Sequence, residues 1–382
     1  MTRSLPPVLL TAALGLSLLA CGDDGSAGET DDPTTDSGGV SATGTDSAPG
    51  TTASTVDPDG TTSGTTAGPG TSTGDPTGEP TSESGSSGEV VCDADTIELP
   101  GDDFYPEGIA SDAAGNLYIT SIATGAVVMA DSCDGEVTEL IAPGEGLVNP
   151  VGLIVVESAG ALVICSSDFS FATPPSIDVR SIEDGSPIAQ HTFDAPGFCN
   201  DLTLDDEGNV YVTDSGGARI LRVAAADLLS DGPAQTWATD PDFMVGKGEF
   251  GLNGIAFDGD SSIYVVNSAQ GALHQVAIEP DGSAGAITPI SIEVAPLAAP
   301  DGLEWLEDGT MLVVEGGLQA VSRITLAGGS ATVQVLADGF DTPTTSAMVG
   351  SDVWVVEGQL DHLLGFDPQP PQVPFVVQRW SR

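Results

Sequence analysis

Residues 198–215 read FCNDLTLDDEGNVYVTDS: a short apolar strand, a turn that contains glycine, and a second strand rich in Val and Tyr. Residues 105–121 (YPEGIASDAAGNLYITS) and 251–268 (GLNGIAFDGDSSIYVVNS) repeat this order. Two β-branched or aromatic runs around a glycine turn are typical of an antiparallel hairpin. The stretch therefore predicts a β-hairpin unit that the chain uses more than once.

Six copies of this unit follow one another, beginning near residues 105, 149, 198, 251, 299 and 343, which are 44 to 53 residues apart. A third strand follows the hairpin, as at residues 219–223, and a fourth apolar run precedes the next copy, as at residues 138–141. Four short strands in each of six repeats predict an all-β fold, a six-bladed β-propeller of four-stranded blades. A β-sandwich is the alternative, and six equal repeats argue against it.

Both ends of the repeat region carry a spare strand, at residues 96–99 and 375–378. We expect one of them to complete a blade made from both termini, because an open ring would leave strand edges exposed. The sequence does not tell which of the two takes part.

The composition limits what the protein can bind. The 382 residues carry 57 acids against 8 Lys and Arg, a formal charge of −49. This charge repels phosphate backbones and anionic lipid head groups, which excludes nucleic-acid binding and polybasic membrane docking as main functions. With 5 Cys and 3 His, the chain has few sulfur or nitrogen ligands, so any metal is expected to be held by oxygen. His191, His274 and His362 lie away from the repeat starts and are interpreted as ordinary strand or loop residues.

The first twenty residues are typical of an export signal. Arg3 precedes an apolar run from Pro7 to Ala20 that is too short to span a bilayer stably. The run ends in Leu-Leu-Ala before Cys21, which resembles the bacterial lipobox, with Cys21 as the lipidated residue. An ordinary signal peptide with a coincidental cysteine is the alternative. The resemblance implies a lipoprotein held on the cell envelope (outer membrane, periplasm or cell surface) by its acyl chains alone.

From Gly22 to Val90 the chain is almost entirely Thr, Ser, Gly, Asp and Pro, with no aromatic, Leu or basic residue. Such a segment buries too little apolar surface to offset the entropy of ordering, which predicts a disordered tether. We therefore expect three parts: a signal peptide at residues 1–20, a lipidated tether at 21–90 and the propeller at 91–382.

Four cysteines remain in the propeller region, an even number in an exported protein: Cys92, Cys133, Cys165 and Cys199. Three pairings are possible, and free buried thiols are the alternative to disulfides. We favour Cys92–Cys133, which would tie the N-terminal strand to the first blade, and Cys165–Cys199 between the second and third blades.

One polar column runs through the repeats, at the residue that precedes the glycine of the first strand: Glu107, Val151, Asn200, Asn253, Asp301 and Thr345. Equivalent positions at the start of inner strands converge at one mouth of a propeller's channel. Two desolvated carboxylates that face each other there without a partner would repel or force one to protonate. A hard divalent cation removes this repulsion, and carboxylate and amide oxygens suit calcium better than zinc. The column thus predicts a calcium site made by the two acids and two asparagines; solvated residues that cap turns are the alternative.

Four further polar residues end the second strand of their blades: Asp214, Asn267, Glu315 and Glu357. They could form a second ring near the channel. Hydrogen bonding at turns and strand ends is the commoner role of such residues, so we expect local hydrogen bonds from them.

The residues around the column resemble the family of gluconolactonase, regucalcin (senescence marker protein) and luciferin-regenerating enzyme. The matching motifs are Pro-Glu-Gly-Ile at Glu107, Asn-Asp at Asn200, Leu-Asn-Gly-Ile at Asn253, Pro-Asp-Gly at Asp301 and Thr-Thr-Ser at residues 344–346. The resemblance covers residues 91–382 and implies the same propeller fold.

By that resemblance, Glu107, Asn253 and Asp301 correspond to the family's metal ligands, and Asp301 also to its general base. Asn200 corresponds to the asparagine that contacts substrate or water, and we place Thr345 with it as a substrate- or water-binding residue. The implied reaction is hydrolysis of a lactone or related ester, in which the metal polarises the carbonyl and the bound water while Asp301 handles the proton.

One position departs from the family. Sugar-lactone members carry an arginine two residues before the asparagine of the Asn-Asp motif, and here that residue is Phe198. The change disfavours sugar lactones and favours a more apolar ligand. The leading hypothesis is a monomeric, calcium-dependent lactone or ester hydrolase on the cell envelope. The alternative is a non-catalytic propeller with a structural metal that binds an envelope ligand or a protein partner.

Overall fold

The computed structural model describes residues 92–381 except residues 93, 171, 194–196 and 247–248. The predicted signal peptide, Cys21 and the tether lie outside this part of the chain. Within it, nearly all regular structure is β-strand, and the single α-helix among the described residues is the four-residue α1 (Leu360–Leu363). None of the described helices has the length and hydropathy needed to cross a bilayer.

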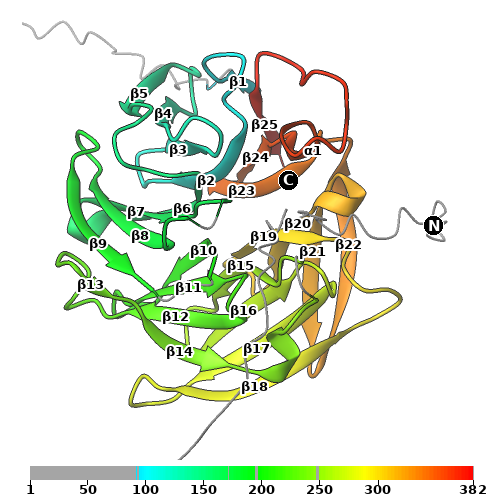
Figure 1. The fold of residues 1–382 in the computed structure, drawn as a ribbon. Coiled ribbons are helices and arrows are strands. Elements are labelled where there is room, and N and C mark those ends of the chain that lie inside the picture. Colours follow the sequence, from blue (N-terminus) through cyan, green and yellow to red (C-terminus); the bar gives the residue numbers. More distant parts are fainter. Residues whose placement is uncertain (1–91, 93, 171, 194–196, 247–248, 382) are drawn as a thin grey trace, which may run out of the picture. The chain divides into compact units, whose positions relative to one another are not determined.

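Six groups of four antiparallel strands surround a central axis (Figure 1). The first group is β2 (Pro106–Ser111), β3 (Asn116–Ser121), β4 (Val127–Asp131) and β5 (Val137–Ile141). The second is β6 (Pro150–Val156), β7 (Ala161–Ser166), β8 (Ser176–Ser181) and β9 (Pro187–Thr192), with the two-residue β13 (Gly232–Pro233) added parallel to β9. The third is β10 (Cys199–Leu204), β11 (Val210–Asp214), β12 (Arg219–Val223) and β14 (Gln235–Thr239).

The remaining groups follow the same plan. The fourth is β15 (Leu252–Phe257), β16 (Ser262–Asn267), β17 (Ala272–Ile278) and β18 (Ala284–Ile292). The fifth is β19 (Pro300–Trp305), β20 (Met311–Glu315), β21 (Ala320–Ala327) and β22 (Ser330–Asp338). The sixth is β23 (Pro343–Val349), β24 (Asp352–Glu357), β25 (Val376–Ser381) and β1 (Thr96–Glu98).

Packing between neighbouring groups establishes six blades. Successive residues of a strand face opposite sides of a sheet, so Val210 and Val212 of β11 pack towards the second blade while Tyr211 packs towards the fourth. Six separate buried clusters result, one between each pair of neighbouring blades. Hydrogen bonds join the fourth and fifth blades into one eight-stranded sheet through a short parallel pairing of β18 with β22, but a buried cluster still separates them. The predicted six-bladed propeller is confirmed.

The ring closes through both termini. β25 pairs with β24, and β1 pairs with β25, with Ile97 opposite Val377. The prediction that one terminal strand completes a shared blade is therefore extended, because both strands take part. β1 is the outer strand of the sixth blade, and it covers an edge that would otherwise be open.

Both favoured disulfides are present, Cys92–Cys133 and Cys165–Cys199. The first joins the residues before β1 to the turn after β4, so it links the closing strand to the first blade. The second joins β7 to the first residue of β10, immediately before Asn200. It therefore fixes the start of an innermost strand to the neighbouring blade.

The innermost strands share one irregularity that positions the site. In all six, the register shifts across two consecutive residues near the strand's start, as between Pro106 and Ile109 of β2. The second of these residues is glycine in four blades, because adjacent strands approach very closely there. A Cβ on Gly108 would lie 2.2 Å from the Val151 carbonyl oxygen, and one on Gly254 would lie 2.2 Å from that of Asp301.

Candidate active site at the mouth of the propeller

The bulge of each innermost strand presents one side chain at the same level of the ring. Neighbouring innermost strands contact one another in the closed order β2, β6, β10, β15, β19 and β23. The first bulge residues therefore converge, and they are Glu107, Val151, Asn200, Asn253, Asp301 and Thr344.

In the sixth blade the column residue is Thr344, and not Thr345 as the sequence alignment predicted. Pro343 pairs with Glu357 and Ser346 pairs with Val355, which repeats the pairing of Pro300 with Glu315 and of Leu303 with Val313. Thr344 therefore lies level with Asp301, and its hydroxyl donates to the Glu107 carbonyl oxygen over 2.7 Å. Thr345 occupies the second bulge position, which is glycine in four other blades.

Serine hydroxyls set the orientation of the two asparagines. Ser215 and Ser268 each donate their single hydroxyl proton to a backbone carbonyl of the next innermost strand, that of Leu252 and that of Pro300. Each hydroxyl oxygen can then only accept a hydrogen bond. Asn200 Nδ2 donates to Ser215 Oγ over 2.9 Å, and Asn253 Nδ2 donates to Ser268 Oγ over 3.0 Å. Because the amide nitrogens face the serines, the amide oxygens are left for a ligand.

The ionised forms of Glu107 and Asp301 are unfavourable when no cation is bound. Burial, and then the negative charges of Asp301 and Asp201, raise the pKa of Glu107 well above its usual range. Burial and the charge of Asp201 raise the pKa of Asp301 to about 8, against an opposing hydrogen bond with Asn253. The site therefore favours either protons or a bound cation.

Asp201 is a third central carboxylate that the column did not include. It holds the second bulge position of β10, and burial raises its pKa to about 7. Its side chain accepts from the Leu202 amide over 2.9 Å and from the Ile255 amide of the next blade over 3.2 Å. The signal in the sequence was an acid at the position where four repeats carry glycine.

Below this level the innermost strands enclose a channel of ≈ 330 Å³. All six contribute to its wall, and two of the lining residues, Asp201 and Thr345, directly follow column residues in the chain. A larger cavity of ≈ 580 Å³ lies elsewhere, lined by residues of β12 and β14 and of the turns around residues 227–233 and 281–284, and it contains none of the predicted site residues. The predicted site residues therefore lie around the central channel, and none lines the larger cavity.

Phe198 is the centre of an aromatic group beside the mouth. Its side chain is 2 % exposed, and its ring centroid lies 5.4 Å from that of Phe169 and 4.9 Å from that of Phe250. Leu360 and Leu363 of α1 pack against the same buried cluster. The position that would carry a sugar-binding arginine is thus filled by packed apolar side chains.

The match to known proteins agrees with this geometry. Residues 105–354, more than half of the chain, match the profile of the SMP-30/Gluconolactonase/LRE-like region. The chain belongs to this family. No curated protein matches the sequence.

Several solved structures share the fold at low sequence identity. A luciferin-regenerating enzyme is 14 % identical with a TM-score of 0.55, over 75 % of this chain and 95 % of the other. Regucalcin of Agrobacterium tumefaciens, described as a calcium-binding protein, is 18 % identical with a TM-score of 0.55, over 76 % and 95 %. The major Malassezia sympodialis allergen Mala s 1 is 16 % identical with a TM-score of 0.57, over 75 % and 96 %.

The donor set of this SMP-30-type mouth fits a hard cation, since it offers carboxylate and amide oxygens without sulfur. Among the described Asp, Glu, His and Cys residues, Glu107, Asp201 and Asp301 do not bring three ligand atoms within 4.8 Å of one another. A cation there would therefore use the amide oxygens of Asn200 and Asn253 and water beside the acids.

The four residues that end second strands make local hydrogen bonds, as expected. Asp214 accepts from the Phe198 amide and pairs with Arg219 over 2.8 Å, and Asn267 accepts from the Gln270 amide. Glu315 accepts from the Ala298 amide, and Glu357 accepts from the Gln378 amide group. These four side chains therefore stabilise turns and strand ends through hydrogen bonds.

Two of the three histidines are also ordinary strand residues: His191 Nε2 contacts the Leu228 carbonyl, and His274 is buried in β17. His362 departs from this interpretation. It lies on α1 beside Asp361, and both residues are close to Asp341.

Proposed function

We propose that the protein is a calcium-dependent hydrolase of a lactone or a related ester. The observation that carries the proposal is the convergence of the buried carboxylate of Glu107 and the partly exposed carboxylate of Asp301 with two oriented amide oxygens at one mouth of the channel. Calcium prefers such oxygen donors. The family membership and the calcium binding of the regucalcin neighbour support the same conclusion.

In the proposed hydrolysis, each group of the site has a separate role. Calcium, when bound, supplies positive charge that polarises the carbonyl and keeps the nearby acids ionised. Asp301, which is partly exposed, accepts a proton from the attacking water as the water oxygen bonds to the carbonyl carbon. It returns the proton to the alkoxide oxygen when the ring or ester bond breaks. Asn200 and Asn253 orient the reacting oxygens through amides that Ser215 and Ser268 hold in place.

The aromatic group around Phe198 selects an apolar substrate. Packed phenyl rings offer no hydrogen-bond partner to sugar hydroxyls, and desolvating those hydroxyls without partners is unfavourable. An alkyl-substituted lactone or an aryl ester presents a surface that the two partly exposed rings of this group, Phe169 and Phe250, can cover.

Activity assays of the Asp301→Asn protein test the proposal. With calcium at saturation, we expect the wild type to hydrolyse δ-decalactone or phenyl acetate faster than glucono-δ-lactone. Asp301→Asn should lower kcat by about 10²- to 10⁴-fold, the usual contribution of a general base. Glu307→Gln, an exposed acid in the following turn, is the control and should keep its activity. Wild-type turnover by calcium-loaded Asp301→Asn would refute the general-base role.

A non-catalytic binding module is the second candidate, and the burial of the mouth favours it. Glu107, Asn200 and Asn253 are only 7 %, 6 % and 8 % exposed, which restricts the approach of a substrate. Calcium binding without turnover of any lactone or ester in the panel would support this function, in which the metal holds the mouth and an envelope ligand or protein partner binds it.

Display on the cell envelope is part of the same proposal. Lipidation of Cys21 would anchor the chain, and the acidic tether would hold a monomeric propeller away from the surface. Metabolic labelling with palmitate should mark the wild type but not Cys21→Ser, and only the wild type should sediment with membranes. Equal labelling of both proteins would contradict the anchor.

A further inference from the structure

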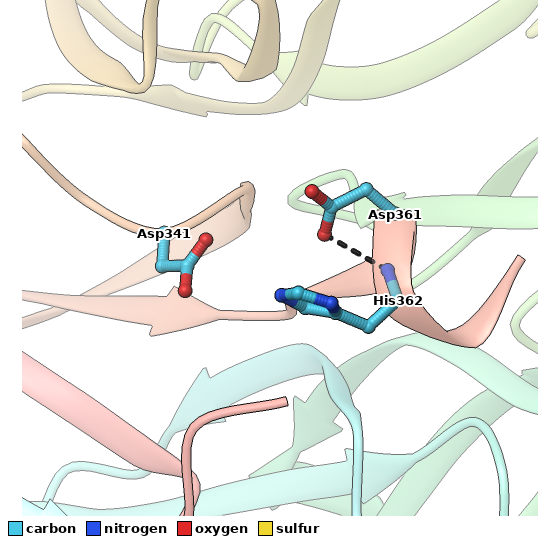
Figure 2. Close-up of side chains that lie close together, drawn as sticks. All are labelled: Asp341, Asp361 and His362. Carbon is cyan, nitrogen blue, oxygen red and sulfur yellow. Dashed lines mark hydrogen bonds between the residues drawn. The ribbon is translucent and has the colours of Figure 1, made fainter. Parts of the chain in front are cut away.

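The geometry points to a second metal site, suited to zinc and made by three residues that do not belong to the mouth's donor set: Asp341, Asp361 and His362. Asp341 lies in the connection between β22 and β23, and the other two residues lie on α1. Their ligand atoms all lie within 4.8 Å of one another. Figure 2 shows one ring nitrogen of His362 turned towards the Asp341 carboxylate, with Asp361 beside it.

A neighbouring carbonyl fixes the tautomer of His362. Its Nδ1 lies 2.9 Å from the carbonyl oxygen of Gln369. Since that oxygen can only accept, Nδ1 carries the proton and Nε2 keeps a free lone pair. Metal-binding histidines have this arrangement, in which the second ring nitrogen donates to a carbonyl or carboxylate.

The two carboxylates are also held from outside the group. Thr342 Oγ1 donates to Asp361 Oδ1 over 3.1 Å, and Gln372 Nε2 donates to Asp341 Oδ2 over 3.2 Å. Each of the three ligands thus has one supporting hydrogen bond to a residue that is not itself a ligand. Such outer contacts orient metal ligands and raise affinity.

The donor set selects the metal. One imidazole and two carboxylates suit zinc, whereas calcium prefers oxygen alone. Zinc ligands about 2.0–2.2 Å from the ion lie within about 4.4 Å of one another, so small side-chain rotations bring this group to binding distance. Three protein ligands leave a fourth position for water.

Zinc would tie α1 to the chain that enters the sixth blade. α1 also carries Leu360 and Leu363, which pack on the cluster that contains Phe198. A metal bound here would therefore hold the helix against the aromatic side of the mouth, without taking part in hydrolysis itself.

Zinc titration of the full-length, chelator-stripped protein tests the site. Calcium in excess keeps the mouth occupied, and calorimetry measures zinc while cobalt absorption reports nitrogen and oxygen ligation. We expect one saturable site in the wild type and in Glu107→Gln. The His362→Ala change should raise the zinc Kd by at least about 100-fold, and the outer change Thr342→Val by about 10- to 100-fold.

Asp338→Asn is the matched control, because this exposed acid lies three residues before Asp341 and removes the same charge. Melting temperatures show which variants are folded; should His362→Ala unfold, Thr342→Val decides. Zinc should also slow hydrogen exchange at residues 360–372 in the wild type and in Asp338→Asn, but not in His362→Ala. The absence of a saturable zinc site in the wild type, or unchanged zinc affinity in folded His362→Ala and Thr342→Val, would overturn the assignment.

Discussion

Single residues at the mouth show where sequence reasoning succeeds and where it stops. Glu107, Asn200, Asn253 and Asp301 could be found because a neighbouring glycine or the Asn-Asp motif marks the column in each repeat. The sixth repeat has no such glycine, since two threonines fill both bulge positions, and only the strand register identifies Thr344. The role of Asp201 could be recognised only from the bulge of β10, because the bulge turns two consecutive residues towards the axis.

The central acids make a prediction about pH. Asp201 and Asp301 have folded-state pKa values of about 7 and about 8, above their unfolded value of 3.8. The folded state therefore binds more protons between about pH 4 and pH 8, and stability must fall as pH rises through this window. Calcium should remove the fall, because it favours the ionised carboxylates.

Melting temperatures from pH 4.5 to 8.5 check this, with chelator or with calcium, in high salt to screen the surface acids. The slope with chelator should be shallower in Asp301→Asn. A melting temperature that does not change with pH in chelator would contradict the raised pKa values of the central acids. So would an equal dependence of the melting temperature on pH with and without calcium.

At the scale of elements, the β-branched and aromatic runs of the hairpins predict the blades, because strands that are buried on both sides between neighbours read as nearly continuous apolar runs. No residue pattern in the sequence indicates contacts between loops that are distant in the chain. Asp341 and the α1 pair Asp361 and His362 are about twenty residues apart in sequence, in segments without a strand pattern, so sequence reasoning interpreted His362 as an ordinary loop residue. The hydroxyls that orient the asparagines were missed for the same reason, because each contacts the next blade.

Replacing Ser268 by alanine tests these contacts between elements. The change leaves the Pro300 carbonyl without the Ser268 hydroxyl and removes the serine contact of the Asn253 amide, which costs about 1–3 kcal/mol when such groups are buried. Calcium affinity should also fall, since the Asn253 amide loses the contact that turns its oxygen towards the ligand. Urea unfolding and calcium titration measure both effects, beside Ser158→Ala at an exposed position. Ser268→Ala with the stability and affinity of Ser158→Ala would exclude the orienting role.

The whole molecule depends on closure by β1. A chain that begins at residue 91 should melt at the same temperature as the full-length protein, because the tether's composition predicts no packing. A chain that begins at residue 100 loses β1 and the Cys92–Cys133 disulfide, and removing such a bond alone typically costs about 2–5 kcal/mol. Thermal unfolding of the three proteins distinguishes them. A large loss in the first truncation, or none in the second, would contradict this assignment of the termini.

Calcium binding at the mouth is the central claim, and calorimetric titration of the chelator-stripped protein tests it most directly. We predict one calcium site per chain in the wild type, and its loss in Glu107→Ala, which removes a carboxylate but leaves the blades intact. The Glu139→Ala protein, changed at an exposed residue of β5, should bind like the wild type. No heat in the wild type, or equal binding by Glu107→Ala, would show that the converging column is not a calcium site.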